Sequence, residues 1–104
     1  ATVRSKYTLT LLKLWNANSM GKLQKATIRG SITEWQSWFL GTDDDGKPRK
    51  WSAGRFRQRV LGVSLKELGE LYPKTIFYLT TEKKGRKVVG YTLDITSVKT
   101  TFQI

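Results

Sequence analysis

The sequence predicts a single, mostly β domain that contains one short helix. The chain has 104 residues, a length typical of one domain, and it shows no repeat and no linker. Apolar and polar residues alternate along several segments, as they do in strands with one buried face. Residues 64–72 instead combine a helical spacing of leucines with a capping motif. We therefore expect residues 1–104 to form one β-rich domain.

The first strand is predicted over residues 5–16, SKYTLTLLKLWN. Apolar side chains alternate there up to Leu11, and the next leucines fall on the opposite parity. A change of parity within a strand predicts a β-bulge or a sharp bend. The alternative is a strand that is buried on both faces. Residues 16–22, NANSMGK, have the composition of a turn.

A second strand is predicted over residues 24–33, and the following apolar run extends it to a point near Leu40. Residues 41–50, GTDDDGKPRK, contain no apolar side chain and have the composition of a hairpin tip. Their three adjacent aspartates resemble part of a calcium loop, but basic residues follow where further oxygen ligands are needed. We therefore expect a turn there and no metal site.

Residues 51–61, WSAGRFRQRVL, are compatible with two structures. As a strand, they place three arginines on one face. As a helix, they begin at the capping residue Ser52 and end at Gly62. The strand is the preferred prediction.

A short helix is predicted over residues 64–72, SLKELGELY. Ser64 and Glu67 have the spacing of a capping box. Leu65, Leu68 and Leu71 or Tyr72 share one face at helical spacing. Pro73 predicts the end of this helix, because the residue before a proline avoids the helical conformation.

Two further strands are predicted over residues 75–82 and 87–99. The tight polar turn between them contains Gly85, which suits a position with positive φ. The complete order is strand, strand, strand, helix, strand, strand. With the parity break in the first strand, this order resembles the OB-fold, a small five-stranded Greek-key barrel. The resemblance is topological, and it implies that single-stranded nucleic acid binds across the second and third strands.

Charge is the clearest functional signal in the sequence. The chain carries 19 Lys and Arg against 8 Asp and Glu, a net charge of +11. So large a surplus predicts a polyanionic partner. Nucleic acid is the commonest such partner, because each neutralised phosphate releases condensed counterions. The alternatives are a basic surface kept for solubility and a protein partner that is acidic.

The composition argues against an enzyme. The chain has no Cys and no His, which removes thiolate chemistry, Cys-ligated zinc and the commonest general base. It lacks a phosphate-binding glycine loop, and its eight carboxylates form no convincing acid–base pair. We expect no catalytic residue, no cofactor and no metal. A Mg-dependent nuclease is the minor alternative.

The sequence gives no sign of a membrane segment. No apolar run approaches the roughly 20 residues that span a bilayer. No basic-then-apolar leader opens the chain. We expect no membrane partner and a cytoplasmic location, in the host cell if the protein is viral.

The strongest candidate binding segment lies between residues 47 and 59, where basic and aromatic residues interleave without an acid. Positive side chains can follow a phosphate backbone, and flat rings can stack on bases. The predicted nucleic-acid-binding residues are Lys47, Arg49, Lys50, Trp51, Arg55, Phe56, Arg57 and Arg59. The alternative is a charged edge strand that resists aggregation.

Two smaller clusters complete the predicted site. Three aromatic residues before the loop cannot all face one core in a regular strand, so at least one is expected to be exposed for stacking: Trp35, Trp38 and Phe39. The alternative for them is the barrel core or a dimer interface. Four basic residues at the second hairpin tip are expected to clamp a backbone: Lys83, Lys84, Arg86 and Lys87. The alternative for them is an ordinary solvated turn.

Together these observations predict a non-catalytic module that binds single-stranded nucleic acid, with DNA favoured over RNA. Its mechanism is a basic groove that tracks the backbone while aromatic rings stack on bases. Small size and the lack of catalytic equipment suit a replication or recombination accessory of a phage or plasmid. Exposed strand edges make a homodimer possible.

Two other functions stay open. The first is a regulator that binds duplex DNA or structured RNA, which would follow if residues 52–61 form a helix that reads a major groove. The second is a small inhibitor or adaptor that binds a protein through Trp35, Trp38 and Phe39 and is steered by its charge.

Overall fold

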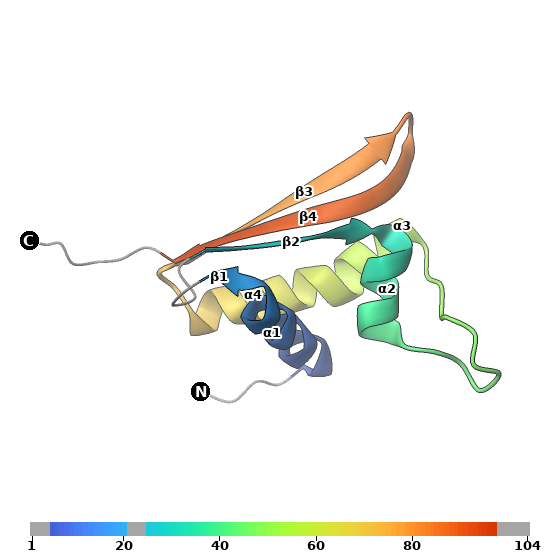
Figure 1. Cartoon of the computed structure of the whole chain (residues 1–104), viewed down its shortest axis with the longest axis horizontal. Coiled ribbons are helices and arrows are strands. Elements are labelled where there is room, and N and C mark those ends of the chain that lie inside the picture. The colour runs from blue at the N-terminus through green and yellow to red at the C-terminus, as the bar shows by residue number, and fades with distance from the viewer. Residues whose placement is uncertain (1–4, 21–24, 98–104) are drawn as a thin grey trace, which may run out of the picture.

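The computed structural model describes residues 5–20 and 25–97. Its four strands form one antiparallel sheet in the order β1-β2-β4-β3, and the helices lie together on one side of that sheet (Figure 1). In chain order the elements are helix α1 (Lys6–Asn18), strands β1 (Ser19–Met20) and β2 (Lys25–Ser31), helices α2 (Ile32–Leu40) and α3 (Ala53–Phe56), the π-helical turn η1 (Arg57–Leu61), helix α4 (Gly62–Leu71), and strands β3 (Thr75–Lys84) and β4 (Lys87–Ser97).

The predicted first strand is wrong, because residues 6–18 form helix α1. Its start is capped by Ser5, whose side-chain oxygen accepts a hydrogen bond from the Tyr7 backbone N–H. Leu11 and Trp15 are both buried, four residues apart on one helical face. The change of parity in the apolar pattern was therefore the mark of a helix and not of a β-bulge.

The predicted extension of the second strand to Leu40 is also wrong. Strand β2 ends at Ser31, and helix α2 begins there with a capping box. The Ser31 side chain accepts a bond from the Glu34 backbone N–H, and the Glu34 carboxylate accepts one from the Ser31 backbone N–H. Gly41 follows the helix with a φ of 68°, a left-handed value that glycine adopts without strain.

The predicted third strand is wrong, and the helical alternative is right about its start. Helices α3, η1 and α4 continue without a break from Ala53 to Leu71, and we call this run the composite helix. Ser52 caps it by accepting a bond from the Arg55 backbone N–H. Gly62 does not end it, because the Gly62 N–H donates to the carbonyl of Arg57 in a π-helical turn and the helix runs on.

The short helix predicted over residues 64–72 is the second half of the composite helix. Tyr72 caps its C-terminus and Pro73 follows, as expected. Ser64 does not form the predicted capping box, because it is buried within the helix and its hydroxyl donates to the Val60 carbonyl at 2.7 Å. A helix that starts at Ala53, eleven residues before Ser64, needs no cap at this position.

The second predicted hairpin is confirmed. Strands β3 and β4 pair antiparallel over almost their whole length, and Gly85 in the turn has a φ of 65°. The two residues of the predicted strand at positions 98 and 99 lie outside the described residues. The strand pattern held here because alternate residues of β4, namely Tyr91, Leu93 and Ile95, are fully buried against the helices.

The predicted five-stranded OB-like barrel is wrong. The described sheet is open, and helices cover one of its faces only (Figure 1). The core lies between this face and the helices, and it includes Leu11 from α1, Trp35 from α2 and Phe56 from the composite helix. Three of the segments that were expected to supply strands supply this helical layer instead, because helices also bury apolar residues at regular spacing.

Candidate nucleic-acid interface

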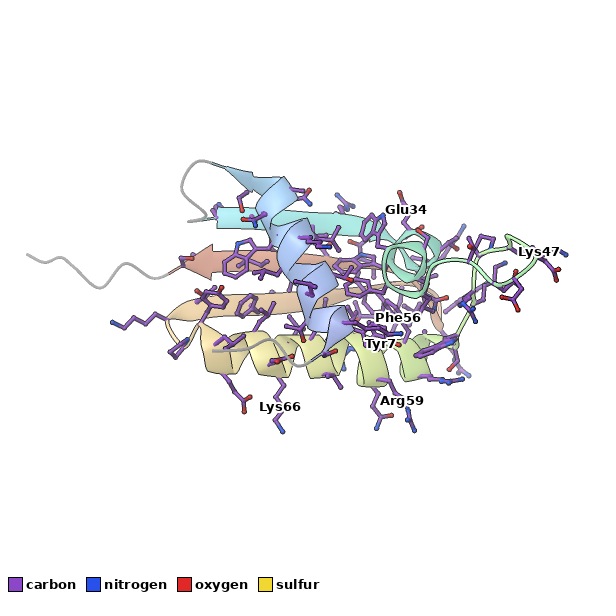
Figure 2. All side chains as sticks on the ribbon, turned by 90° about the horizontal axis from the view of Figure 1, so that it is seen from below. Tyr7, Glu34, Lys47, Phe56, Arg59 and Lys66 are labelled. Atoms are coloured by element: carbon purple, nitrogen blue, oxygen red, sulfur yellow. The ribbon has the colours of Figure 1, made fainter. Side chains whose placement is uncertain are left out.

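The composite helix separates its apolar and basic side chains on opposite faces. Phe56 and Val60 are fully buried in the core. Arg55, Arg59 and Lys66 are exposed. In Figure 2, Arg59 and Lys66 point outward on the side away from α1 and α2. The exposed face from Arg55 to Lys66 is therefore a basic ridge that no described residue covers, while Glu70 is exposed nearer the C-terminal end of the helix.

The four basic residues predicted at the second hairpin tip are all exposed: Lys83, Lys84, Arg86 and Lys87. The tip lies at the same end of the molecule as helix α3 (Figure 1). Lys87 and Lys50 both line a surface pocket of about 330 Å³ beside Ala53, the first residue of the composite helix. The hairpin tip and the start of the composite helix therefore contribute to one basic region.

The loop over residues 41–52 joins two helices and not two strands, so its predicted place in a hairpin is wrong. Its prediction as a turn is right. The carboxylate of Asp43 accepts bonds from the backbone N–H groups of Asp45 and Lys47, at 2.9 and 3.0 Å. The Arg49 Nε donates to the Thr42 carbonyl at 3.1 Å. The first aspartate thus serves the turn geometry, while Lys47 and Lys50 remain exposed.

Most of the predicted stacking aromatics are core residues. Trp35 and Phe56 are fully buried, and Phe39 is nearly so. The Phe39 ring lies about 6 Å from the rings of Trp35 and Phe56, and these two rings lie about 6 Å from the Tyr91 ring, measured between centroids. The prediction that these three rings stack on bases is wrong, because in a helix residues four apart share the buried face. The alternative function as a protein-binding adaptor relied on Trp35 and Phe39 as contact residues, and their burial removes that support. Trp38 is half-buried against Trp35, and its role stays a prediction.

Trp51 and Arg55 lie together at the start of the composite helix. The Arg55 guanidinium carbon lies over the Trp51 ring, 4.1 Å from its centroid. The backbone of Trp51 is held on both sides by the side-chain amide of Gln36, which accepts from the Trp51 N–H at 3.1 Å and donates to its carbonyl at 2.8 Å. Sequence reasoning did not select Gln36, because nothing in the pattern links α2 to this loop.

Tyr91 anchors the same end of the composite helix to the sheet. Its hydroxyl donates to the Ala53 carbonyl at 3.3 Å, and its backbone carbonyl accepts from the Trp35 indole N–H at 3.0 Å. Burial raises the pKa of Tyr91 above its usual value, and the positive charge of Arg57 opposes part of that rise. The hydroxyl therefore remains a donor throughout the neutral range.

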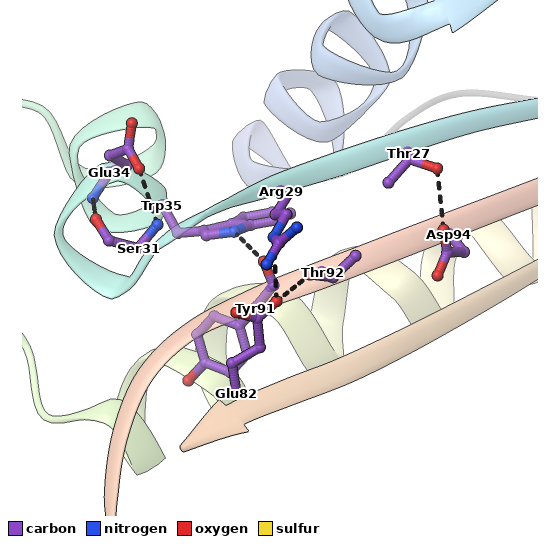
Figure 3. A network of polar contacts seen from close by, with 9 residues as sticks. All are labelled: Thr27, Arg29, Ser31, Glu34, Trp35, Glu82, Tyr91, Thr92 and Asp94. Atoms are coloured by element: carbon purple, nitrogen blue, oxygen red, sulfur yellow. Dashed lines mark hydrogen bonds and ion pairs between the residues drawn. The ribbon is translucent and has the colours of Figure 1, made fainter. Parts of the chain in front are cut away.

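On the outer face of the sheet, charged side chains contact partners within the protein. Figure 3 shows Arg29 beside Glu82, with a Nε to carboxylate distance of 3.5 Å, and Thr92 donating to the same carboxylate. The Thr27 hydroxyl donates to Asp94 at 3.0 Å. Arg29 is thus partly neutralised within the protein, unlike the arginines of the composite helix.

Two exposed residues of the basic ridge were missed in the sequence, Gln58 and Lys66. Both follow from a helical interpretation of the segment, because Arg55, Gln58 and Arg59 then lie three and four residues apart on one face. The prediction of a strand obscured this spacing.

Comparison with known proteins places this architecture in a family. Residues 31–95 match the family described as "Initiator Rep protein, WH2", which is more than half of the chain. The chain belongs to this initiator Rep family. The predicted association with DNA and with replication is confirmed at that level. No curated protein matches the chain significantly.

A solved structure has the same fold as this chain. The chain is similar to a structure described as "Crystal structure of Pi initiator protein in complex with iteron DNA", with a TM-score of 0.74 and 20% identity. The alignment covers 91% of this chain and 40% of the other, so this chain spans less than half the length of the Pi initiator chain. Helices with an antiparallel hairpin, as in a winged helix, therefore replace the predicted OB-like barrel. The favoured ligand, single-stranded DNA, finds no support here.

Proposed function

We propose that this chain is a non-catalytic domain of a replication initiator and that it binds duplex DNA. The composite helix enters a major groove, and the tip of the β3–β4 hairpin lies on the neighbouring phosphate backbone. Helix-turn-helix proteins place their second helix in the groove in this way. The observation that carries the proposal is the basic ridge of the composite helix, which lies beside a hairpin tip with four exposed basic residues.

Duplex DNA fits this surface better than a single strand does. Binding of single strands without sequence preference depends on rings that stack on successive bases. Trp35, Phe39 and Phe56 are buried in the core and are not available for that purpose. A basic helix with a free outer face instead has the shape that a major groove admits.

A non-catalytic role is supported by the tasks of the acidic residues. Glu34 caps helix α2, Asp43 accepts bonds that hold a turn, Glu82 pairs with Arg29, and Asp94 accepts a bond from Thr27. Within the described ranges, no three acidic side chains gather in a way that could hold a metal ion.

None of the described helices is long and apolar enough to cross a membrane.

The test is a fluorescence anisotropy titration of the chain with a mixed-sequence duplex and with oligo(dT), each at several salt concentrations. We expect tighter binding to the duplex, with a slope of log K against log salt of about −0.9 for each phosphate contacted. Lys83→Ala/Lys84→Ala should weaken duplex binding and make that slope shallower.

The matched control is Lys13→Ala/Lys25→Ala, which removes two exposed lysines outside the composite helix and the hairpin tip. This control should bind the duplex nearly as well as the unmodified chain. Tighter binding to oligo(dT) than to the duplex would contradict the proposal, as would equal losses in the two double variants.

A further inference from the structure

Arg55 occupies the first turn of the composite helix. Its backbone N–H donates to the Ser52 cap at 3.2 Å, which fixes the direction in which the helix starts. Its side chain is exposed at the end of the helix that also borders Lys50 and Lys87. In helix-turn-helix complexes, the N-terminal residues of the second helix are those that contact base edges.

The side chain of Arg55 is held by an aromatic face. Its guanidinium lies 4.1 Å from the centroid of the Trp51 ring. A guanidinium carries its five N–H donors in its own plane, so stacking on a ring engages the face and leaves the donors free. No acceptor among the described residues takes a hydrogen bond from this side chain, and no carboxylate there pairs with it.

Trp51 is itself held in place. Gln36 is only 4% exposed and bonds to both the N–H and the carbonyl of Trp51. These two bonds fix the loop directly before the composite helix. By comparison, among the described residues neither Arg57 nor Arg59 stacks over a ring as Arg55 does, and neither forms an ion pair, although the charge of Arg57 acts on the Tyr91 hydroxyl.

We propose that Arg55 reads a guanine and that Trp51 and Gln36 are positioning residues for it. An arginine fork recognises the O6 and N7 atoms of guanine with two hydrogen bonds. A fork that is already oriented in the free protein needs little further ordering when it binds. The inference rests on the proposed function, since it requires the composite helix to lie in a major groove.

The experiment selects ligands from a pool of duplexes with a randomised core, using the whole chain. The unmodified chain should enrich a G·C pair at one or more positions. Arg55→Gln and Trp51→Leu should both lose the preference at the same base pair by about tenfold, while preferences elsewhere persist. Trp51→Phe, which keeps an aromatic face, should retain the preference.

The matched control is Arg59→Gln, which removes an exposed arginine of the same helix that contacts no ring. It should leave the Arg55-dependent base pair unchanged. A salt titration of Trp51→Leu should show the slope of the unmodified chain, because loss of positioning removes no phosphate contact. Since Arg55 is exposed, Arg55→Gln tests base reading even if Trp51→Leu fails to fold.

Four results would overturn the inference. An unchanged preference in Arg55→Gln or in a folded Trp51→Leu shows that the pair reads no base. Uniform weakening across all sequences by Arg55→Gln, with a salt slope shallower by about 0.9, identifies a phosphate contact instead. Duplex binding without any enriched position overturns base reading and leaves the proposed function standing. Failure to bind any duplex overturns both.

Discussion

Arginines lie both on the composite helix and on the outer face of the sheet, but among the described residues only the arginine on the sheet has an acidic neighbour. On the sheet, Arg29 lies beside the Glu82 carboxylate, which also accepts a bond from Thr92. On the composite helix, Arg57 and Arg59 have no acidic partner among the described residues. None of the eight acidic residues lies between Ala53 and Lys66 of the composite helix, whereas Glu82 and Asp94 lie on the sheet. The difference indicates which surface is left for an anionic partner.

The largest expected effect comes from the buried side of the composite helix. Phe56→Ala removes a fully buried ring and should lower the free energy of unfolding by about 3–5 kcal/mol. Urea denaturation followed by circular dichroism measures this change. Gln58→Ala, on the exposed side of the same helix, should change stability by less than about 0.5 kcal/mol. Similar losses in the two variants would show that the helix does not separate its faces as described.

Charge reversal tests the comparison directly. Arg55→Glu/Arg59→Glu should weaken duplex binding by about 100-fold at moderate salt, since two positive charges on the DNA-facing helix are replaced by negative ones. Arg29→Glu changes an arginine that already has a carboxylate neighbour, and it should weaken binding far less. Anisotropy titrations at two salt concentrations measure both. If Arg29→Glu causes an equal loss, the sheet face takes part in binding and the comparison fails.

A smaller effect is expected within the sheet network. Glu82→Gln removes the charged partner of Arg29, which is largely exposed. The free energy of unfolding should therefore fall by at most about 1 kcal/mol. Duplex binding should stay the same or increase slightly, because Arg29 is no longer partly neutralised. Thermal melting and anisotropy together check this prediction, which a large loss of binding would refute.

The smallest effect concerns pH. The pKa of Tyr91 is raised by burial, so the folded state resists ionisation that the unfolded state undergoes near pH 10. The stability contributed by this group should therefore be constant below pH 10 and decrease as the pH rises above it. Urea denaturation at a series of alkaline pH values measures the decrease. Tyr91→Phe should show a shallower decrease, and an identical curve would count against this account.

The sequence contained correct information about the second hairpin and misleading information about the helices. Strand alternation in β4 and the glycine turn at Gly85 are local signals, and both were sufficient. Helix α2 was missed although Ser31 and Glu34 have the spacing of a capping box. The run of large aromatic residues that follows fills both parities of a strand, and only the helical spacing of Trp35 and Phe39 explains why both are buried.

The candidate site was predicted in part for the same reason. The basic residues from Lys47 to Arg59 were located by composition, which does not depend on secondary structure. The aromatic residues were assigned by their parity in a strand, so the error in secondary structure became an error in function. The bonds from Gln36 to Trp51 join residues 15 apart through a loop, and no local pattern predicts such a contact.

The π-helical turn η1 has a consequence for alignments of related sequences. A Cβ atom on Gly62 would lie 3.2 Å from the Arg57 carbonyl oxygen, so glycine leaves the room that this widened turn needs. A π-helical turn holds one more residue than an α-helical turn over nearly the same rotation, so the residues after η1 keep their buried and exposed faces but are shifted by one position in the sequence. When contact residues are transferred from a relative that lacks this residue, positions before and after η1 should therefore be aligned as two blocks with a one-residue gap between them.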